Sequence, residues 1–274
     1  MRESGVGARG PGQRWQVPTR VHSVVDVNDH IREIRLRGPG LAGPRCSPGA
    51  HVVVRVTAGT GYARRVYSIW LSSPQHALAV LRLAMHGDGA PGCVWARTVK
   101  PGDDVVIEPP RSKITIDPAA AFHLFAGDET AAVPLLAMHA AIHRSAAPEC
   151  RPPVVGVFEA GDAGAEVPGV PDVPPLPWVH RGGASAVASP VLLDAVRDLE
   201  LPAGTGTAYL AGESMTCRLL QRHLVEERGW PRRSVRVQQH WAPGRPGFGA
   251  GADEPATARA PAGGRAASGR RPRW

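Results

Sequence analysis

Two patterns of apolar residues divide this chain of 274 residues near Asp117 and Pro118. Before that point, short β-branched runs are separated by Gly and Pro, which is typical of a small antiparallel barrel. After it, strand-like runs alternate with Gly turns and helix-like stretches, which favours a parallel sheet with helices on its faces. Because the chain exceeds the usual size of one domain, we predict a six-stranded antiparallel β-barrel at 17–117 and an α/β domain at 118–244.

The runs that define the two halves are short and bounded by turn residues. In the first half we predict strands at Val21–Val27, Ile31–Arg37, His51–Val56, Val66–Trp70, Ala79–Met85 and Val105–Glu108. In the second half we predict strands at Phe122–Ala126, Val154–Phe158, Trp178–His180, Thr207–Ala211 and Ser234–Trp241. The predicted helices are Ala131–Arg144, Pro190–Leu199 and Ser214–Arg228. In such a parallel sheet, ligands bind beyond the carboxyl ends of the strands.

Both ends of the chain lack apolar periodicity. Residues 1–16 and 245–274 are rich in Gly, Pro, Ala and Arg and cannot bury enough surface to offset the entropy of ordering, so we expect both to be disordered. The net charge is +8, and the segment from Gly244 onward carries six arginines against Asp253 and Glu254. Because these arginines are not interleaved with aromatic residues, we predict a solvated extension and no nucleic-acid partner.

Composition also excludes several function classes. No apolar run approaches the roughly 18 residues of a membrane span, and the N-terminus lacks the apolar stretch of a secretory signal. We therefore expect a cytoplasmic, monomeric protein with no membrane partner. The four cysteines form no C-x-x-C pair, and His139 and His143, one helical turn apart, lack a third ligand, so we predict no metal site.

Arg65, Val66, Tyr67 and Ser68 form the sharpest local motif of the first half. Side chains alternate along a strand, so Arg65 and Tyr67 project from one face and Ser68 is offered at the strand's end. An arginine can fork onto a pyrophosphate, an aromatic ring can lie against a flavin, and a hydroxyl can hydrogen-bond the flavin edge. Taken alone, the same pattern also describes ordinary sheet surface.

A Gly-rich segment from His86 to Ala96 directly follows the predicted strand that ends at Met85. Its glycines let backbone N–H groups approach a phosphate, and the residues from about Gly92 can open a helix whose N-terminus favours anions. The segment is thus a candidate for a second diphosphate contact. The alternative is a turn without a ligand.

Seven segments occur in the order found in siderophore-interacting proteins. They are Arg65–Ser68, His86–Ala96, Pro101–Asp103, Ala126–Thr130, Ala211–Ser214, Arg222–Gly229 and Trp241 with Gly244. From about Val17 to Gly244 the chain therefore resembles this family of FAD-dependent ferric-siderophore reductases within the ferredoxin-reductase-like superfamily. The resemblance implies an enzyme that carries FAD on the barrel, accepts hydride from NADPH or NADH on the α/β domain, and reduces a ferric siderophore to release ferrous iron.

The resemblance also implies a role for each matching position. It assigns Arg65 to the FAD phosphates, Tyr67 to the isoalloxazine face and Ser68 to the flavin N5/O4 edge, so Tyr67 and Ser68 are expected at the reacting ring. The implied FAD contacts of the Gly-rich segment are His86, Gly87, Gly89, Ala90, Pro91, Gly92 and Trp95. The implied nicotinamide cleft comprises Gly127, Asp128, Glu129, Thr130, Gly212 and Glu213, and Trp241 belongs to the C-terminal segment that approaches the flavin.

Several departures from the family pattern leave the substrate and the nucleotide open. Trp70 stands where the family has a basic residue, and His240 and Ala242 replace the aromatic residue and the arginine that usually flank Trp241. Candidates to attract NADPH or an anionic chelate are Arg64, Arg111, Lys113 and Arg181, although each could be a surface charge. Two other functions fit: a flavin reductase or biosynthetic flavoenzyme with another acceptor, or a protein that binds flavin or siderophore without turnover.

Overall fold

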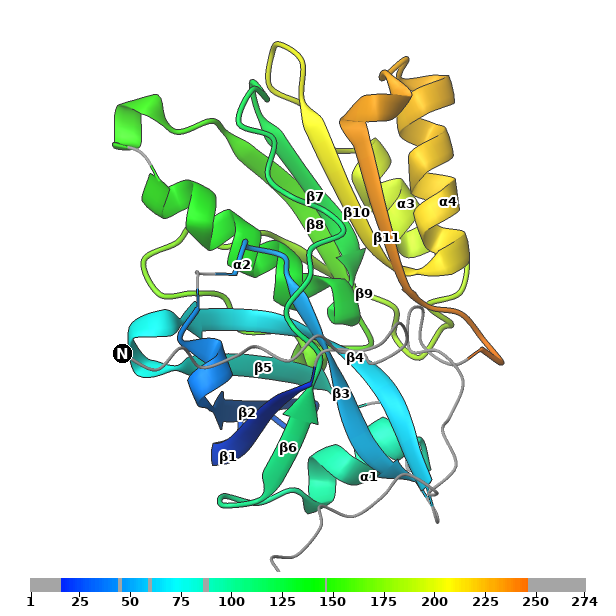
Figure 1. Cartoon of the computed structure of the whole chain (residues 1–274). Helices are drawn as coiled ribbons and strands as arrows, with labels where there is room; N and C mark the ends of the chain where they lie inside the picture. The colour runs from blue at the N-terminus through cyan, green and yellow to red at the C-terminus, as the bar shows by residue number, and fades with distance from the viewer. Residues whose placement is uncertain (1–15, 44–45, 59–60, 86–88, 146, 246–274) are drawn as a thin grey trace, which may run out of the picture.

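The computed structural model describes residues 16–43, 46–58, 61–85, 89–145 and 147–245. The expectations for the two chain ends, and for His86 and Gly87, lie outside these described residues. Within them the chain forms two sheets, one from each half (Figure 1). None of the described helices is long and apolar enough to cross a membrane.

The first sheet is a closed antiparallel barrel, which confirms the predicted fold class of this half. Its strands are β1 (Val17–Asp26), β2 (Ile31–Arg37), β3 (His51–Ala58), β4 (Gly61–Ser73), β5 (Leu78–Ala84) and β6 (Asp104–Ile107). They follow the order β1-β2-β5-β4-β3-β6, and β1 closes the barrel by pairing with β6. Branched side chains such as Ile34, Val54 and Ile107 fill the interior and are fully buried. Helix α1 (Pro91–Thr98) packs beside β3 and β4 at one end (Figure 1).

The second sheet has five parallel strands in the order β11-β10-β7-β8-β9, which confirms the predicted α/β half. The strands are β7 (His123–Asp128), β8 (Val154–Ala160), β9 (Trp178–His180), β10 (Thr207–Glu213) and β11 (Val235–Trp241). The helices are α2 (Glu129–Ser145), α3 (Pro190–Arg197) and α4 (Ser214–Arg222). Every residue of β7 and β10 is buried because α2 covers one face of the sheet while α3 and α4 cover the other (Figure 1).

Helix α2 also joins the two halves. Its apolar residues share one core cluster with Phe125 and Tyr209 of the parallel sheet and with Ile31 of the barrel. Trp70 of β4 packs against the same cluster. The helix therefore lies between the sheet and the barrel, so that β4 is held close to the carboxyl ends of β7, β10 and β11 (Figure 1).

The start of α2 differs slightly from the prediction. The helix begins at Glu129 rather than Ala131, because the Asp128 carboxylate accepts hydrogen bonds from the backbone amides of Thr130 and Ala131 in its first turn. Pro134 lies inside the helix and has no N–H. The carbonyl of Thr130, four residues earlier, consequently lacks its usual helical partner.

Candidate functional site

Strand β4 presents Arg65, Val66, Tyr67 and Ser68 to a cavity between the barrel and the parallel sheet. The ring of Tyr67 stacks on that of Trp95 from α1, with ring centroids 5.6 Å apart and planes inclined by 24°. Burial raises the pKa of the Tyr67 hydroxyl, which therefore stays protonated. Its oxygen is buried and has no hydrogen-bond partner among the described residues.

The turn into α1 comes close to this strand. Ala90 is extended, Pro91 begins the helix, and Gly92 is buried against β4. A Cβ atom placed on Gly92 would lie 2.5 Å from the Tyr67 hydroxyl oxygen and 3.4 Å from Cγ of Arg65. By contrast, a Cβ on Gly89 would meet no atom within 4 Å. The fold thus brings together the two segments that sequence analysis assigned to one diphosphate.

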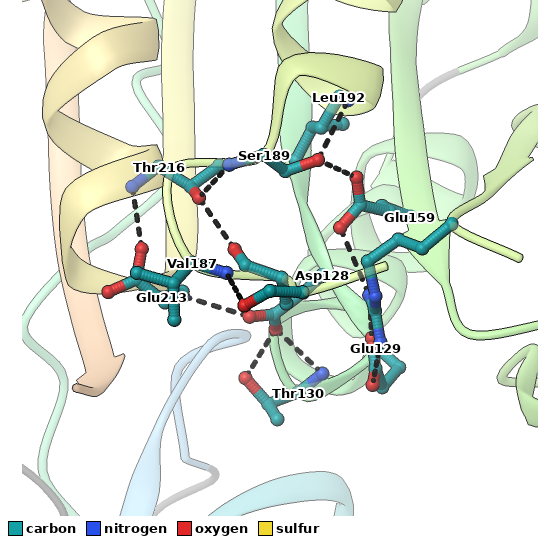
Figure 2. Close-up of polar contacts among 12 residues, drawn as sticks. Asp128, Glu129, Thr130, Glu159, Val187, Ser189, Leu192, Glu213 and Thr216 are labelled. Carbon is teal, nitrogen blue, oxygen red and sulfur yellow. Dashed lines mark hydrogen bonds and ion pairs between the residues drawn. The ribbon is translucent and has the colours of Figure 1, made fainter. Parts of the chain in front are cut away.

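Asp128 is buried at the carboxyl end of β7, and its side chain connects the ends of three strands. Figure 2 shows its contacts with Thr130 and Glu213. Its Oδ1 accepts hydrogen bonds from Thr130 N at 2.9 Å and Thr130 Oγ1 at 2.5 Å. Its Oδ2 accepts from Glu213 N of β10 at 2.8 Å and from Trp241 Nε1 of β11 at 2.9 Å. Gly212 adopts φ +112°, and a Cβ there would lie 2.6 Å from the Asp128 carboxylate, so a side chain is excluded.

A cavity of about 210 Å³ joins the two predicted half-sites. It is lined by Arg65, Val66, Tyr67, Ser68, Arg82, Leu83, Ala84, Lys113, Thr130, Val133, Gln238, Gln239, His240 and Trp241. Predicted flavin residues of β4 therefore share one space with Thr130 of the predicted cleft and with Trp241 of the C-terminal segment. Gly127, Asp128, Gly212 and Glu213 do not line it. They lie behind its wall, where Asp128 holds Thr130 and Trp241 in place.

Glu129 takes part in a separate network at the same edge of the sheet (Figure 2). Its carboxylate pairs with Arg181 through two contacts, of 3.0 and 2.9 Å. Arg181 also contacts Glu159 at 3.0 Å, and the Ser189 hydroxyl donates to the other oxygen of Glu159. Glu159 is fully buried and the Arg181 side chain is 10% exposed. Arg181 is therefore paired with two carboxylates of the protein and does not face the cavity as a candidate for an anionic ligand.

Of the four basic candidates from the sequence, Lys113 is the one that lines the cavity. Arg64 is buried and donates from Nε to Glu108 at 2.8 Å. Nearby, the pKa of His51 is lowered to about 4, mainly by burial and next by the charge of Lys113. Lys113 and Arg65 give the cavity a positive lining.

Arg82 of β5 is a cavity residue that belongs to none of the motifs found in the sequence. Its guanidinium lies over the Trp70 ring at 3.8 Å and its Nε donates to Glu33 at 3.0 Å. A basic group thus reaches the cavity from the neighbouring strand, beside the tryptophan that replaces the family's basic residue. Arg82 lies beside β4 because β5 pairs with β4 in the folded barrel. No local sequence motif indicates this pairing.

His240, Gln238 and Gln239 are further cavity residues without a predicted role. They precede Trp241 in β11, and the unusual histidine beside Trp241 was the available signal in the sequence. His240 Nδ1 lies 3.3 Å from Thr130 Oγ1. The side-chain oxygen of Gln238 is buried and has no hydrogen-bond partner among the described residues.

A closed antiparallel barrel followed by a five-stranded parallel sheet, with a cavity where they meet, defines a ferredoxin-reductase-like fold. Residues 120–244 match the family model described as siderophore-interacting protein. This match confirms the resemblance found in the sequence and extends over the α/β half. A search of curated proteins found no match.

Solved structures of low sequence identity share the fold. A siderophore utilization protein from T. fusca has a TM-score of 0.71 and 23% identity, over 87% of this chain and 98% of that chain. The siderophore-interacting protein SipS from Aeromonas hydrophila has a TM-score of 0.70 and 23% identity, over 85% and 93%. Phthalate dioxygenase reductase, described as transferring electrons from pyridine nucleotides to [2Fe-2S], has a TM-score of 0.64 and 18% identity, over 84% and 70%.

Proposed function

We propose that this protein is an FAD-dependent NAD(P)H oxidoreductase that reduces ferric siderophores and releases ferrous iron. In this proposal residues 17–117 hold FAD and residues 118–244 hold the nicotinamide nucleotide. The observation that carries it is the shared cavity, in which Arg65, Tyr67 and Ser68 meet Thr130 and Trp241. The family match and the fold support it independently.

The residues around the cavity fit a flavin nucleotide. The buried Tyr67 hydroxyl has no hydrogen-bond partner among the described residues, and Gly92 packs directly against it. Such a buried polar atom without a partner favours a bound polar ligand. Arg65 would hold the phosphates, Tyr67 the face of the ring and Ser68 its N5/O4 edge. The Gly-rich turn before α1 would supply backbone N–H groups to the diphosphate.

Bound FAD would supply the chemistry, because a flavin accepts a hydride and passes electrons on one at a time. Overall, one NAD(P)H and two ferric ions would give NAD(P)⁺, one proton and two ferrous ions. The protein's contribution is position. Asp128 fixes Trp241 and Thr130 on the sheet side, and β4 fixes Ser68 on the barrel side. Lys113 and Arg65 make the space attractive to an anionic nucleotide or chelate.

An anaerobic titration of the FAD-loaded full chain tests this function. NADH or NADPH should bleach the flavin absorbance, because both half-sites open into one cavity. A ferric siderophore should then restore the oxidised spectrum while ferrous iron accumulates in a chelator trap. The nicotinamide that bleaches faster at equal concentration identifies the preferred donor.

The two halves of this experiment can fail separately. Bleaching without reoxidation by ferric chelates would keep the flavin reductase and point to another acceptor, such as the iron–sulfur centre named for the phthalate enzyme. Bound FAD that neither nicotinamide bleaches would favour a protein that binds flavin without turnover. A purified chain that does not bind FAD would contradict the proposal altogether.

A further inference from the structure

His240 occupies a position in the cavity wall where its ring has a defined hydrogen-bonding state. Its Nδ1 lies 3.3 Å from Thr130 Oγ1, and that hydroxyl donates its own hydrogen to Asp128 Oδ1 at 2.5 Å. Because the hydroxyl hydrogen is already used, Thr130 Oγ1 can only accept from His240. This arrangement places a proton on Nδ1 and leaves Nε2 as the basic nitrogen of the neutral ring. Thr130 is therefore a positioning residue for His240, and Asp128 is the fixed acceptor behind it.

We propose that His240 is a catalytic base of this site, whose Nε2 accepts the proton that reduced FAD gives up when ferric ions oxidise it. The inference rests on the proposed function. His240 takes one proton from N5 of the two-electron-reduced, singly protonated flavin, while two ferric ions take the two electrons and become ferrous. The neutral imidazole becomes imidazolium and then releases the proton to solvent, so charge and atoms balance.

The surroundings of His240 suit a base rather than an acid. Burial lowers its pKa, and Lys113 lowers it further, while Asp128 and the Thr130 backbone raise it. Among the described residues, the charged or titratable side chains that face the ring or share its cavity are Asp128, Lys113, His51, Arg65, Tyr67 and Arg82. The ring is consequently neutral near neutral pH and able to take a proton. The Thr130–Asp128 pair then stabilises the cation that forms.

Nitrogen-15 NMR of the FAD-loaded, oxidised full chain with labelled histidine tests the hydrogen-bonding state without turnover. We expect His240 in the Nδ1–H tautomer, with a pKa below the ordinary value of 6.5. Thr130→Val should abolish the tautomer preference and Thr130→Ser should restore it, because serine keeps the hydroxyl. A neutral Nε2–H tautomer in the parent would overturn the proposal.

The kinetic test begins with photochemically reduced FAD, so that the nicotinamide site is not required. The reduced protein is mixed with excess ferricyanide, and separately with ferric EDTA, at a series of pH values. The reoxidation rate of the parent should fall as pH drops through the His240 pKa found by NMR. His240→Gln should slow reoxidation roughly a hundredfold, at the lower end of general acid–base effects, and flatten the pH profile. Where the glutamine variant does not hold FAD, His240→Phe replaces it.

The control is His143→Gln on α2, since His143 lines a different cavity with Arg151 and should keep the parent profile. A parent-like rate and pH profile in the His240 variant would overturn the proposal. If neither nicotinamide bleaches the flavin while reoxidation still depends on His240, the proposed donor reaction is wrong and this inference stands. Reoxidation by ferricyanide but not by ferric EDTA or a ferric siderophore would reject the ferric acceptor alone.

Discussion

At the scale of single residues, the site depends on the missing side chain of Gly92. A Cβ there would lie 2.5 Å from the Tyr67 hydroxyl oxygen. The Tyr67 ring is also stacked on Trp95, so it cannot move aside without disturbing that pair. Gly92 is a helical residue without positive φ, and the contact with Tyr67 rather than backbone strain is therefore what forbids alanine.

Gly92→Ala should weaken FAD binding by roughly ten- to a hundredfold, because overpacking of this size costs about 1–3 kcal/mol. Equilibrium FAD binding, followed by the quenching of flavin fluorescence, measures the effect. The loss should be much smaller when Gly92→Ala is made in a Tyr67→Phe background, since phenylalanine lacks the clashing oxygen. Gly43→Ala is the control, because a Cβ at that position is in open space and the residue lies outside the proposed FAD contacts. Equal effects at the two glycines would contradict this account.

At the scale of elements, the Arg181 network holds together the carboxyl ends of β7, β8 and β9. Glu129 starts α2, Glu159 lies in β8 and Arg181 follows β9, and the three side chains are almost entirely buried. Burial raises the pKa of Glu159, whereas its hydrogen bonds with Ser189 and Arg181 act in the opposite direction. The network therefore stays intact only while Arg181 supplies its charge.

Arg181→Met should lower the free energy of unfolding by about 3–5 kcal/mol, because it leaves two buried carboxylates without their cation. Urea denaturation followed by circular dichroism measures this loss. Adding Glu129→Gln and Glu159→Gln should recover part of it, since neutral amides need no counter-charge. Arg197→Met is the control: Arg197 pairs with Asp194 and Glu227 on the surface, and its loss should change little. Equal destabilisation by both arginine variants would reject the role of the network.

At the scale of the whole molecule, buried histidines link stability to pH. Burial lowers the pKa of His51 and of His139 from 6.5 to about 4, and neighbouring cationic groups contribute. In the unfolded chain both side chains take up protons below pH 6.5, while in the folded protein they stay neutral until about pH 4. Unfolding therefore binds protons in this window, so each histidine contributes stability above pH 6.5 that is lost as pH falls toward 4.

His139→Leu should remove part of this pH dependence. The Nδ1 atom of His139 is buried and has no partner among the described residues, so an apolar side chain can replace it. Between pH 6.5 and 4.5 the melting temperature of the parent should fall more steeply than that of the variant. Comparing the two proteins cancels the shared contributions of His51 and Glu159. If the melting temperatures of the parent and the variant fall equally with pH across this range, His139 does not titrate as described.

Local sequence determined the fold class of each half and the approximate position of almost every strand and helix. Strand β2 matches its predicted range, and β9 was predicted from three residues, because period-two alternation and bounding turns are local properties. The order of Arg65–Ser68, the Gly-rich turn and Ala126–Thr130 was likewise enough to predict a shared ligand site. The turns and strand ends of those segments are set by their local sequence. In the folded chain, Tyr67 and Thr130 line one cavity.

Tertiary structure alone decided which charges face the cavity. Glu129 and Arg181 are 52 residues apart in the sequence and pair only because β7 and β9 end at the same edge of one sheet. The proton proposed on His240 Nδ1 depends on the hydroxyl of Thr130, 110 residues away, which itself donates to Asp128. A local motif fixes which groups are present, whereas ion pairing and tautomer depend on distances between remote side chains that only packing sets.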